Sequence, residues 1–417
     1  MVSAMGPRSL RIAWLGPAPG EGGGVPGVST ELLDGLARLG HRIDCFFPSS
    51  GQTLPERLLE NPNLKFIWGT AEWQWDRWYS RSRITAFASG MIARGYASVR
   101  LRRAIATEHA GEPYDIVYQF SSIESLAVPT GVTRTVPLVI HPETHSAGEL
   151  RALIAERDIS RRCEPFHLFL SACAIMLARS FVQVARIRRA SLLVCISAVF
   201  RDHLVHDYRF PVDATVVVPN PVRIARFDPG RRSHTDPPTV LVLGRIAVRK
   251  GVDDVVTVAR LLRDRGVAVR IRVVGGPSLW SDYTPLLDEL PPETAEYAGA
   301  LPAAEVPGEI ERSDVLLQAS RYEPFALTVA EALASGVPVV ATSEVGASEG
   351  VDAAVMSVVA PGDVEAMADA VIAALARSRS EPAAISATAR AEAERLFATD
   401  VVVAKLSQAL ERLAAEG

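Results

Sequence analysis

The sequence predicts an α/β protein of two Rossmann-like domains that face each other across a cleft. The chain has 417 residues, which is too long for one ordinary hydrophobic core and fits two domains of roughly 200 residues each. Short apolar runs, typical of buried strands, alternate with helical segments in both halves. A segment rich in Pro, Gly, Arg and Ser at 228–238 has the composition of a linker. We therefore expect an N-terminal domain over residues 1–225, a C-terminal domain over 226–397 and a final helix within 398–417.

Composition places the chain among soluble globular proteins, because 48% of its residues are apolar and 22% are charged. The four cysteines show neither C-x-x-C pairing nor metal-ligand spacing, so we interpret them as core thiols in a reducing cytoplasm. Arg11 and Gly16 interrupt the first apolar run, and no apolar stretch is long enough to span a bilayer. We therefore expect no signal peptide, no transmembrane helix and a cytoplasmic location.

The two halves of the chain carry different charge. Residues 1–220 hold 24 Lys and Arg against 20 Asp and Glu, and the remainder holds 20 against 28. Neither half has the basic surplus of a nucleic-acid-binding domain. We therefore expect no nucleic acid as a partner, and different partners for the two halves.

The first predicted unit is a strand, a glycine turn, a helix and a second strand. The strands are expected at 10–15 and 41–47 and the helix at 29–39. A βαβ unit of this kind places its first loop at the carboxyl edge of the sheet. Gly23 and Gly24 lie in that loop, although the glycines are not spaced as a dinucleotide fingerprint. A flexible surface turn is the alternative interpretation.

Residues 72–103 combine aromatic side chains with arginines. Three tryptophans and a tyrosine at 73–79 are followed by arginines up to Arg103, and no acidic residue interrupts these arginines. Such a mixture can bind a sugar ring, an anionic acceptor or a membrane surface. Core packing with a solvated arginine face explains it equally well. A peripheral contact with the inner face of the cell membrane is therefore one hypothesis for this segment.

The longest apolar helix is expected over residues 165–189. Its arginines lie toward the carboxyl end, where cations interact favourably with the helix dipole. We expect this helix to pack on the N-terminal domain.

A histidine ends one of the later strands of the N-terminal half. Short apolar runs at 114–118 and 137–141 predict strands, and the second run ends in His141. Active sites of α/β proteins gather at the carboxyl ends of strands, whereas a lone histidine is usually structural or exposed. Glu143 and His145 follow on the same loop and are weaker candidates for holding an acceptor.

A second strand-and-turn arrangement opens the C-terminal domain. The strand at 240–244 ends in Gly244, and the next strand ends in Gly275. Arg245 and Lys250 lie in the turn that follows the first of these strands. Two cations framed by glycines near a helix start suit a diphosphate, although two surface cations without a ligand are the alternative.

Two glutamates flank a strand-to-helix turn later in this domain. Residues 314–319 predict a buried strand and 329–335 a helix. Glu323 falls on the loop and Glu331 in the first helical turn, where free N–H groups and the positive end of the helix dipole suit an anion. The pair Thr328 and Glu331 also matches a capping box, which would make the role of Glu331 structural.

The stretch from Glu323 to Val340 resembles the donor-site signature of glycosyltransferase family 4. That signature contains a Glu, a Gly or Pro, Phe-Gly-Leu, and a second Glu that opens Glu-Ala-x-Ala-x-Gly-x-Pro-Val-Val, and Glu331 opens that phrase here. Ala326 stands where the family usually has Gly, so its methyl group would crowd a close backbone approach to phosphate. The resemblance extends over most of the chain, more weakly in the first half, where 22–25 resembles the Gly-Gly-Val loop of the family.

The resemblance implies a GT-B fold and a retaining transfer of sugar from a nucleoside diphosphate sugar that binds the C-terminal domain. Arg245 and Lys250 would clamp the diphosphate in place of a metal, Glu331 would hold the ribose, and Glu323 and His141 would contact the sugar. Further donor contacts are expected at Gly244, Gly275, Phe325, Ala326, Leu327 and Thr328, with Gly23 and Gly24 near the diphosphate and the acceptor. The sequence contains no Asp-x-Asp, so we expect no metal and no other cofactor. The final helix would cross back onto the N-terminal domain.

The resemblance leaves the donor base, the sugar and the acceptor open. A lipid-linked or phosphoinositol-like acceptor and a small metabolite are both compatible with it. Two other functional classes share the two-domain layout, namely nucleotide-sugar 2-epimerases and non-catalytic sugar-nucleotide sensors.

Overall fold

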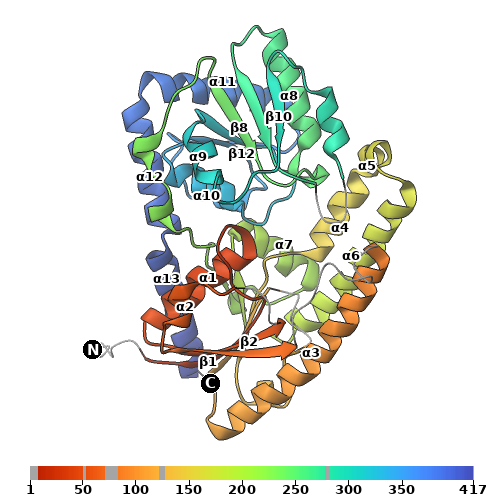
Figure 1. The fold of residues 1–417 in the computed structure, drawn as a ribbon, viewed down its shortest axis with the longest axis vertical. Helices are drawn as coiled ribbons and strands as arrows, with labels where there is room; N and C mark the ends of the chain where they lie inside the picture. Colours follow the sequence, from red (N-terminus) through yellow and green to blue (C-terminus); the bar gives the residue numbers. More distant parts are fainter. Residues whose placement is uncertain (1–7, 50–52, 71–82, 122–126, 278–281, 417) are drawn as a thin grey trace.

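The computed structural model describes residues 8–49, 53–70, 83–121, 127–277 and 282–416, and at 49, 70, 83–94 and 248 it describes the backbone alone. These residues form two parallel sheets with helices on both faces (Figure 1). This arrangement confirms the predicted α/β class with two Rossmann-like units. The aromatic residues and arginines predicted at 73–81 lie outside the described residues.

The first sheet has seven parallel strands in the order β3-β2-β1-β4-β5-β6-β7. The strands are β1 Arg11–Leu15, β2 Arg42–Ser49, β3 Leu64–Thr70, β4 Ile116–Phe120, β5 Leu138–His141, β6 Leu192–Cys195 and β7 Thr215–Val217. In β1, Ile12 and Trp14 face one apolar cluster, whereas Ala13 and Leu15 face another. Successive side chains of a strand point to opposite faces. Both faces of the sheet are therefore buried, which explains why its strands read as continuous apolar runs.

Helices α1 (Gly24–Arg38) and α13 (Thr399–Glu416) cover one face of this sheet, and α3 (Arg83–Gly111) and α7 (Ala198–Tyr208) cover the other. The prediction that the first helix starts near Ser29 is wrong, because α1 begins at Gly24 and Ser29 is buried inside it. Pro26 fits the first turn, where a missing N–H costs nothing. Further helices of this half are α2 Glu56–Leu59, α4 Ser146–Ala155, α5 Arg157–Cys163 and α6 Phe166–Ile187.

The second sheet has six parallel strands in the order β10-β9-β8-β11-β12-β13. The strands are β8 Thr239–Leu243, β9 Arg270–Val274, β10 Ala295–Gly299, β11 Val315–Gln318, β12 Val339–Thr342 and β13 Met356–Val359. Helices α8 (Val252–Asp264) and α11 (Val364–Ser380) pack on one face. Helices α10 (Leu327–Ala334) and α12 (Pro382–Phe397) pack on the other, and the short α9 (Val306–Glu311) contacts α10.

The chain passes between the two sheets twice, and the two crossings are bonded to each other. The Val222 N–H, after β7, donates to the Phe397 carbonyl at the end of α12 over 2.7 Å, and Val222 and Ala398 form an isolated parallel bridge. Helix α13 then packs on α1 of the first domain. The two helices approach so closely that a Cβ atom on Gly35 would lie 2.5 Å from Val403.

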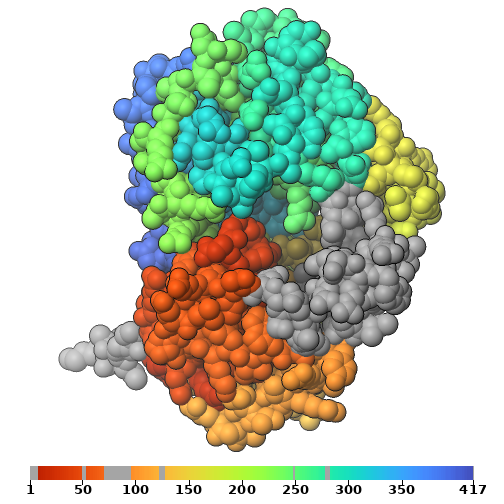
Figure 2. Space-filling model, in the orientation of Figure 1, coloured from red at the N-terminus to blue at the C-terminus, as the bar shows by residue number. Residues whose placement is uncertain are grey.

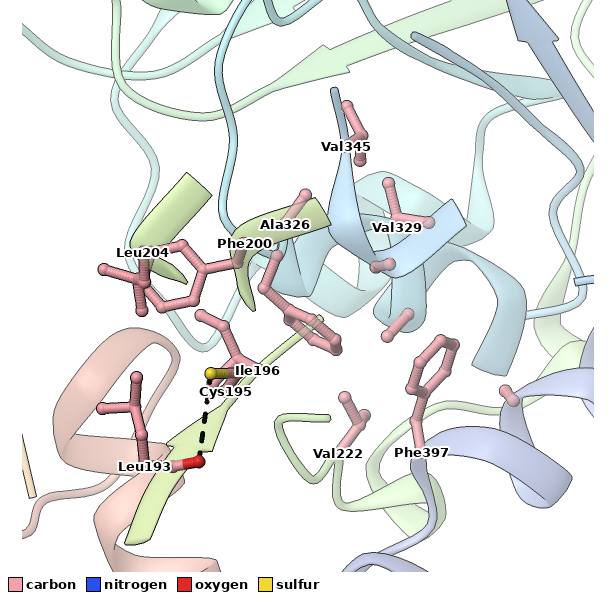
Figure 3. Close-up of a cluster of buried hydrophobic side chains, with 14 of the residues drawn as sticks. Leu193, Cys195, Ile196, Phe200, Leu204, Val222, Ala326, Val329, Val345 and Phe397 are labelled. Carbon is pink, nitrogen blue, oxygen red and sulfur yellow. Dashed lines mark hydrogen bonds between the residues drawn. The ribbon is translucent and has the colours of Figure 1, made fainter. Parts of the chain in front are cut away.

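An apolar cluster joins the two domains (Figure 3). Phe200 of α7 and Ile196 before it come from the first domain, and Ala326 and Val345 come from the second. The ring of Phe325 meets that of Phe397 edge to face, with 5.6 Å between their centres. Because these side chains are buried against each other, the two domains share part of one hydrophobic core.

Helix α6 packs on the first domain through only part of its surface. Its Gln183 is buried and fixed at both ends, since Oε1 accepts from the Ser146 N–H over 2.9 Å and Nε2 donates to the Thr144 carbonyl over 2.6 Å. Among the described residues, α6 is the one helix long and apolar enough to cross a membrane by length and composition. The sequence analysis did not anticipate this, because Arg179 and Gln183 interrupt its apolar run. The bonds of Gln183 hold α6 against the domain.

Candidate functional site

Two helix starts, one from each domain, meet at the carboxyl ends of the sheets (Figure 1). Gly23 is the N-cap of α1. Glu331 is the fifth residue of α10, so the prediction that it lies in the first helical turn is wrong, because the helix begins at Leu327. A Cβ atom placed on Gly23 would lie 3.7 Å from Glu331 Oε1. The first N–H groups of a helix have no intrahelical acceptor and carry partial positive charge. The predicted glycine loop and the predicted ribose-binding glutamate are therefore neighbours, at a place suited to an anion.

The start of α10 does not form the capping box considered from the sequence. Ala326 is the N-cap, with φ 74° and ψ 83°, and its side chain makes no capping bond. Thr328 lies inside the helix, where its hydroxyl donates to Gln318 Oε1 over 3.2 Å. The capping interpretation of Glu331 is therefore wrong, because the helix begins before Thr328 and that hydroxyl bonds elsewhere.

Ala326 occupies a left-handed backbone conformation that favours glycine. Its methyl group is buried in the interdomain cluster with Phe200 (Figure 3). The substitution of the glycine usual in the family therefore adds apolar packing at the cost of backbone strain. Phe325 is also buried in this cluster, so only its backbone is available to a ligand.

The side chain of Glu331 is partly exposed, but its carboxyl group lies mostly among protein atoms. Burial raises its pKa to about 7, although the charge of Arg226 acts in the opposite direction. A carboxyl group in such a position gains from any ligand that supplies hydrogen-bond donors, since hydrogen bonds favour its charged form.

Glu323 is held by two cations from the turn after β8. Arg249 Nη1 lies 3.0 Å from Glu323 Oε2, and Lys250 pairs with the same oxygen. Burial alone would raise the pKa of Glu323, but Lys250 and Arg249 lower it to about 2. Burial lowers the pKa of Lys250, and Glu323 opposes that effect. The sequence analysis gave Glu323 and Lys250 separate roles and did not select Arg249, whereas the structure brings all three into one cluster.

Close backbone contacts place Arg245 and Lys250 near the strand ends. A Cβ atom on Gly275 would lie 1.7 Å from the Gly244 carbonyl oxygen, and one on Gly251 would lie 2.0 Å from that of Ala319. Only glycine fits at these two positions, which also have positive φ angles. The exposed side chain of Arg245 lies close enough to Lys250 for its charge to help lower the pKa of the lysine. The two predicted cations are thus neighbours.

His141 faces a set of buried polar atoms in the first domain. Its Nδ1 lies 2.6 Å from the Tyr118 hydroxyl, and its Nε2 lies 3.5 Å from Glu143 Oε1. The Asn220 amide donates to the other oxygen of Glu143 over 2.9 Å. Three atoms of this group are buried without a hydrogen-bond partner, namely His141 Nε2, Glu143 Oε1 and Asn220 Oδ1. Because leaving buried polar atoms unpaired costs free energy, such a cluster is suited to a hydroxyl-rich ligand.

Burial shifts both titratable groups of this cluster toward their neutral forms. It lowers the pKa of His141 to about 3 and raises that of Glu143 to about 7. It also keeps Tyr118 protonated by raising its pKa well above the usual value. We assign the Tyr118 hydroxyl as donor to His141 Nδ1, which leaves the proton of the neutral ring on Nε2, facing Glu143.

His145, which the sequence offered as a weaker candidate for holding an acceptor, bridges the two domains. Its Nδ1 lies 2.8 Å from the Tyr322 hydroxyl of the second domain, and its Nε2 lies 2.9 Å from Asp207 Oδ2 of α7. Both ring nitrogens therefore have protein partners, and we interpret His145 as structural. The sequence carried no signal for this role, because its partners are far away along the chain.

A large surface cavity lies elsewhere. About 410 Å³ in volume, it lies at the amino edge of the first sheet, and its lining includes Arg11, Asp44, Lys65 and Glu108. These charges already pair with each other, with Arg11 to Asp44 and Lys65 to Glu108 both at 2.8 Å. Active sites of parallel sheets lie at the opposite edge, so we place no function here. Among the described residues, no group of three or more His, Cys, Asp or Glu could hold a metal ion.

Comparison with known families matches nearly the whole chain. The family described as "Glycosyltransferase Family 4" matches residues 22–226, and "Glycosyl transferases group 1" matches residues 225–392. Glycogen synthase of Mycobacterium tuberculosis is 29% identical over 216 residues, which cover 50% of this chain and 50% of that protein. The chain thus spans about half the length of this curated relative. D-inositol 3-phosphate glycosyltransferase of Xylanimonas cellulosilytica is 28% identical and covers 96% of both chains.

Solved structures share the fold at low sequence identity. Sucrose-phosphate synthase of Thermosynechococcus elongatus superposes with a TM-score of 0.69 at 17% identity, covering 98% of this chain and 100% of that one. The Anabaena protein HepE, solved in complex with UDP-glucose, gives a TM-score of 0.62 at 17% identity, covering 97% and 100%. These likenesses confirm the GT-B arrangement of the two domains.

We predict that Glu143→Gln will change the pH dependence of stability. The folded-state pKa of Glu143 is raised to about 7 from 4.5, so its contribution to stability is complete below pH 4.5 and is lost as pH rises through 7. The amide that replaces the carboxyl group cannot ionise, so the variant should be close to wild type at pH 5 and more stable at pH 8. The difference should grow by at most about 1.4 kcal/mol per pH unit between these values.

Thermal unfolding of both proteins from pH 5 to pH 8 measures this effect. Glu60→Gln, at an exposed carboxyl group, is the control and should follow wild type throughout. A wild-type-minus-variant difference that stays constant with pH would contradict the burial of Glu143.

Proposed function

The chain belongs to glycosyltransferase family 4, and we propose that it transfers a sugar from a nucleoside diphosphate sugar to an acceptor hydroxyl group with retention of configuration. The observation that carries the proposal is the meeting of two helix starts, α1 and α10, beside Glu331. This position offers unpaired N–H groups to a diphosphate and a carboxylate to a ribose.

The cations after β8 supply the charge that the leaving diphosphate needs. Breaking the sugar–phosphate bond increases negative charge on the phosphate, and preorganised cations stabilise that charge. Glu323 balances only one of Arg249 and Lys250, so the cluster keeps a net positive charge, to which Arg245 adds. The guanidinium and ammonium groups do here the work that a metal ion does in other transferases.

The N-terminal domain supplies the remaining contacts. The unpaired atoms of His141, Glu143 and Asn220 are suited to hydroxyl groups of the donor sugar or of the acceptor. We place the donor sugar at His141 and Glu323, and the acceptor hydroxyl on the side of Glu143 and Asn220. Since no protein nucleophile is required, the departing phosphate oxygen takes the proton of the acceptor as the new glycosidic bond forms.

Incubation with labelled UDP- and GDP-sugars without acceptor tests the class of activity. We expect slow hydrolysis to free sugar and nucleoside diphosphate, because water replaces the acceptor. UDP-glucose is the first donor to try, since HepE was solved with it. Conversion to the 2-epimer would identify an epimerase instead, and tight binding without turnover would identify a sensor. Either outcome would overturn the proposal.

We predict that Glu331→Gln will lower donor affinity by roughly tenfold or more. The change weakens charge-assisted hydrogen bonds worth on the order of 1.5–3 kcal/mol, at about 1.4 kcal/mol per decade of affinity. Stability should not fall, because Glu331 makes no capping bond and the change removes a carboxyl group whose pKa is raised to about 7. Calorimetric titration with the nucleoside diphosphate measures the affinity, with Glu60→Gln as control. Wild-type affinity in Glu331→Gln would remove this residue from the donor site.

We predict that turnover will persist in excess EDTA. Arg245, Arg249 and Lys250 provide the positive charge at the diphosphate, so no divalent ion is required. The measurement compares initial rates with and without chelator after dialysis. Loss of activity that magnesium or manganese restores would contradict the assignment of these cations.

A further inference from the structure

Helix α6 presents an apolar stripe to solvent. Its outward side chains follow helical spacing, so they form one continuous face. Leu177 is 48% exposed and Phe181 is 69% exposed. The stripe consists of Phe166, Leu170, Ala174, Leu177, Phe181, Val182 and Ala185. A soluble surface rarely leaves so many apolar side chains in one line unless another surface covers them.

The opposite face of α6 packs against the N-terminal domain. Phe169, Met176 and Ile187 are buried in the domain, and Gln183 holds the helix through its hydrogen bonds to the loop before α4. Crossing a membrane would break these contacts and bury the amide of Gln183 in lipid. The stripe therefore faces away from the N-terminal domain, and only a separate molecule or a membrane surface can cover it.

Arginines surround the carboxyl end of the stripe. Arg188 and Arg189 are exposed directly after α6. The charges of Arg189 and of Arg102, on α3, help to lower the pKa of Arg186 to about 10, after burial as the larger cause. Nη1 of Arg186 is buried without a hydrogen-bond partner in the described part of the chain. The guanidinium groups of Arg102, Arg186 and Arg189 thus lie near one another.

Neither α6 nor the adjoining part of α3 carries an acidic residue in its sequence. Residues 165–190 contain no Asp or Glu, and neither do residues 95–107 of α3. The nearest acid before α6, Glu164, accepts from the Asp282 backbone N–H. Tyr96 and Val99 of α3 add further exposed apolar surface, at 70% and 49%.

We propose that the stripe of α6, together with the arginines at its end, docks on an anionic lipid surface. Apolar side chains would enter the acyl boundary, and the guanidinium groups would meet lipid phosphates. A second copy of this chain fits less well, because a two-fold contact pairs a surface with itself and would bring the arginines at the end of α6 against each other. The proposal goes beyond sugar transfer, and it places the exposed face of α6, which begins in the yellow surface at the right of Figure 2, on the membrane.

Co-sedimentation of the whole chain with vesicles tests the proposal. We expect wild type to pellet with vesicles of equal phosphatidylglycerol and phosphatidylcholine at low salt, to pellet less as salt rises, and not to pellet with phosphatidylcholine alone. Leu177→Gln with Phe181→Gln should lower the partition constant by about tenfold or more. Arg188→Gln with Arg189→Gln should lower it at low salt and flatten its dependence on salt.

The matched control is Leu59→Gln with Val358→Gln, which changes exposed apolar residues of α2 and of β13, at 59% and 50% exposure. This control should pellet as wild type does, and all variants should keep wild-type melting temperature and nucleoside diphosphate affinity. Failure of wild type to pellet at low salt overturns the proposal, as does undiminished pelleting of the α6 variants. A wild-type dimer that these variants turn into a monomer would assign the stripe to self-association. If wild type binds no nucleoside diphosphate but still pellets with the vesicles, the proposed function is wrong and the membrane surface remains supported.

Discussion

The buried ion pairs of Glu323 with Arg249 and Lys250 set the geometry of the second domain at the cleft. Taking these three charges out of water is costly, and only close pairing offsets that cost. The pairing fixes the β11–α10 turn against the turn after β8. The backbone of Glu323 also bonds to the loop after β12. Its N–H donates to the Glu344 carbonyl, and its carbonyl accepts from the Gly346 N–H. Glu349, a little further on, accepts from the first two N–H groups of α7 over 2.7 Å each. One cluster of charge thus orders both the proposed donor site and the contact with the first domain.

The facing surfaces of the two domains differ in how far their polar groups are already paired. On the C-terminal side, Glu323 has its cations in place and its pKa is depressed. On the N-terminal side, His141, Glu143 and Asn220 keep unpaired atoms, and burial favours the neutral forms of the two titratable groups. A preformed charged half suits the diphosphate, whose position must be fixed for chemistry. The N-terminal side, whose polar atoms lack hydrogen-bond partners, should bind most tightly a ligand that supplies those hydrogen bonds.

Much of the architecture follows from local pattern. Apolar runs such as 137–141 gave the buried strands, because both faces of each sheet are covered, and the donor phrase placed Glu323 on the loop before α10 and Glu331 within that helix. Features that depend on tertiary contacts could not be predicted from the sequence. The start of α1 at Gly24 depends on a loop that faces the other domain, and the capping bond expected of Thr328 goes to Gln318. The partners of His145 and the unpaired atoms around Glu143 come from segments far apart in the chain, so spacing could not reveal them.

The doubled crossing between the domains has a mechanical consequence. Because Val222 and Phe397 are bonded to each other, the two connections lie side by side and form one edge of the contact between the domains. In Figure 1 the edge lies beside α12 and α13 at the left, while α5 lies on the opposite side of the molecule. There Arg321 meets Glu156 at 3.1 Å and the Tyr283 hydroxyl meets Ser160 at 3.1 Å. A rotation about the edge would displace α5 more than the residues beside the edge, so these two polar contacts resist such a rotation with the longest lever arm.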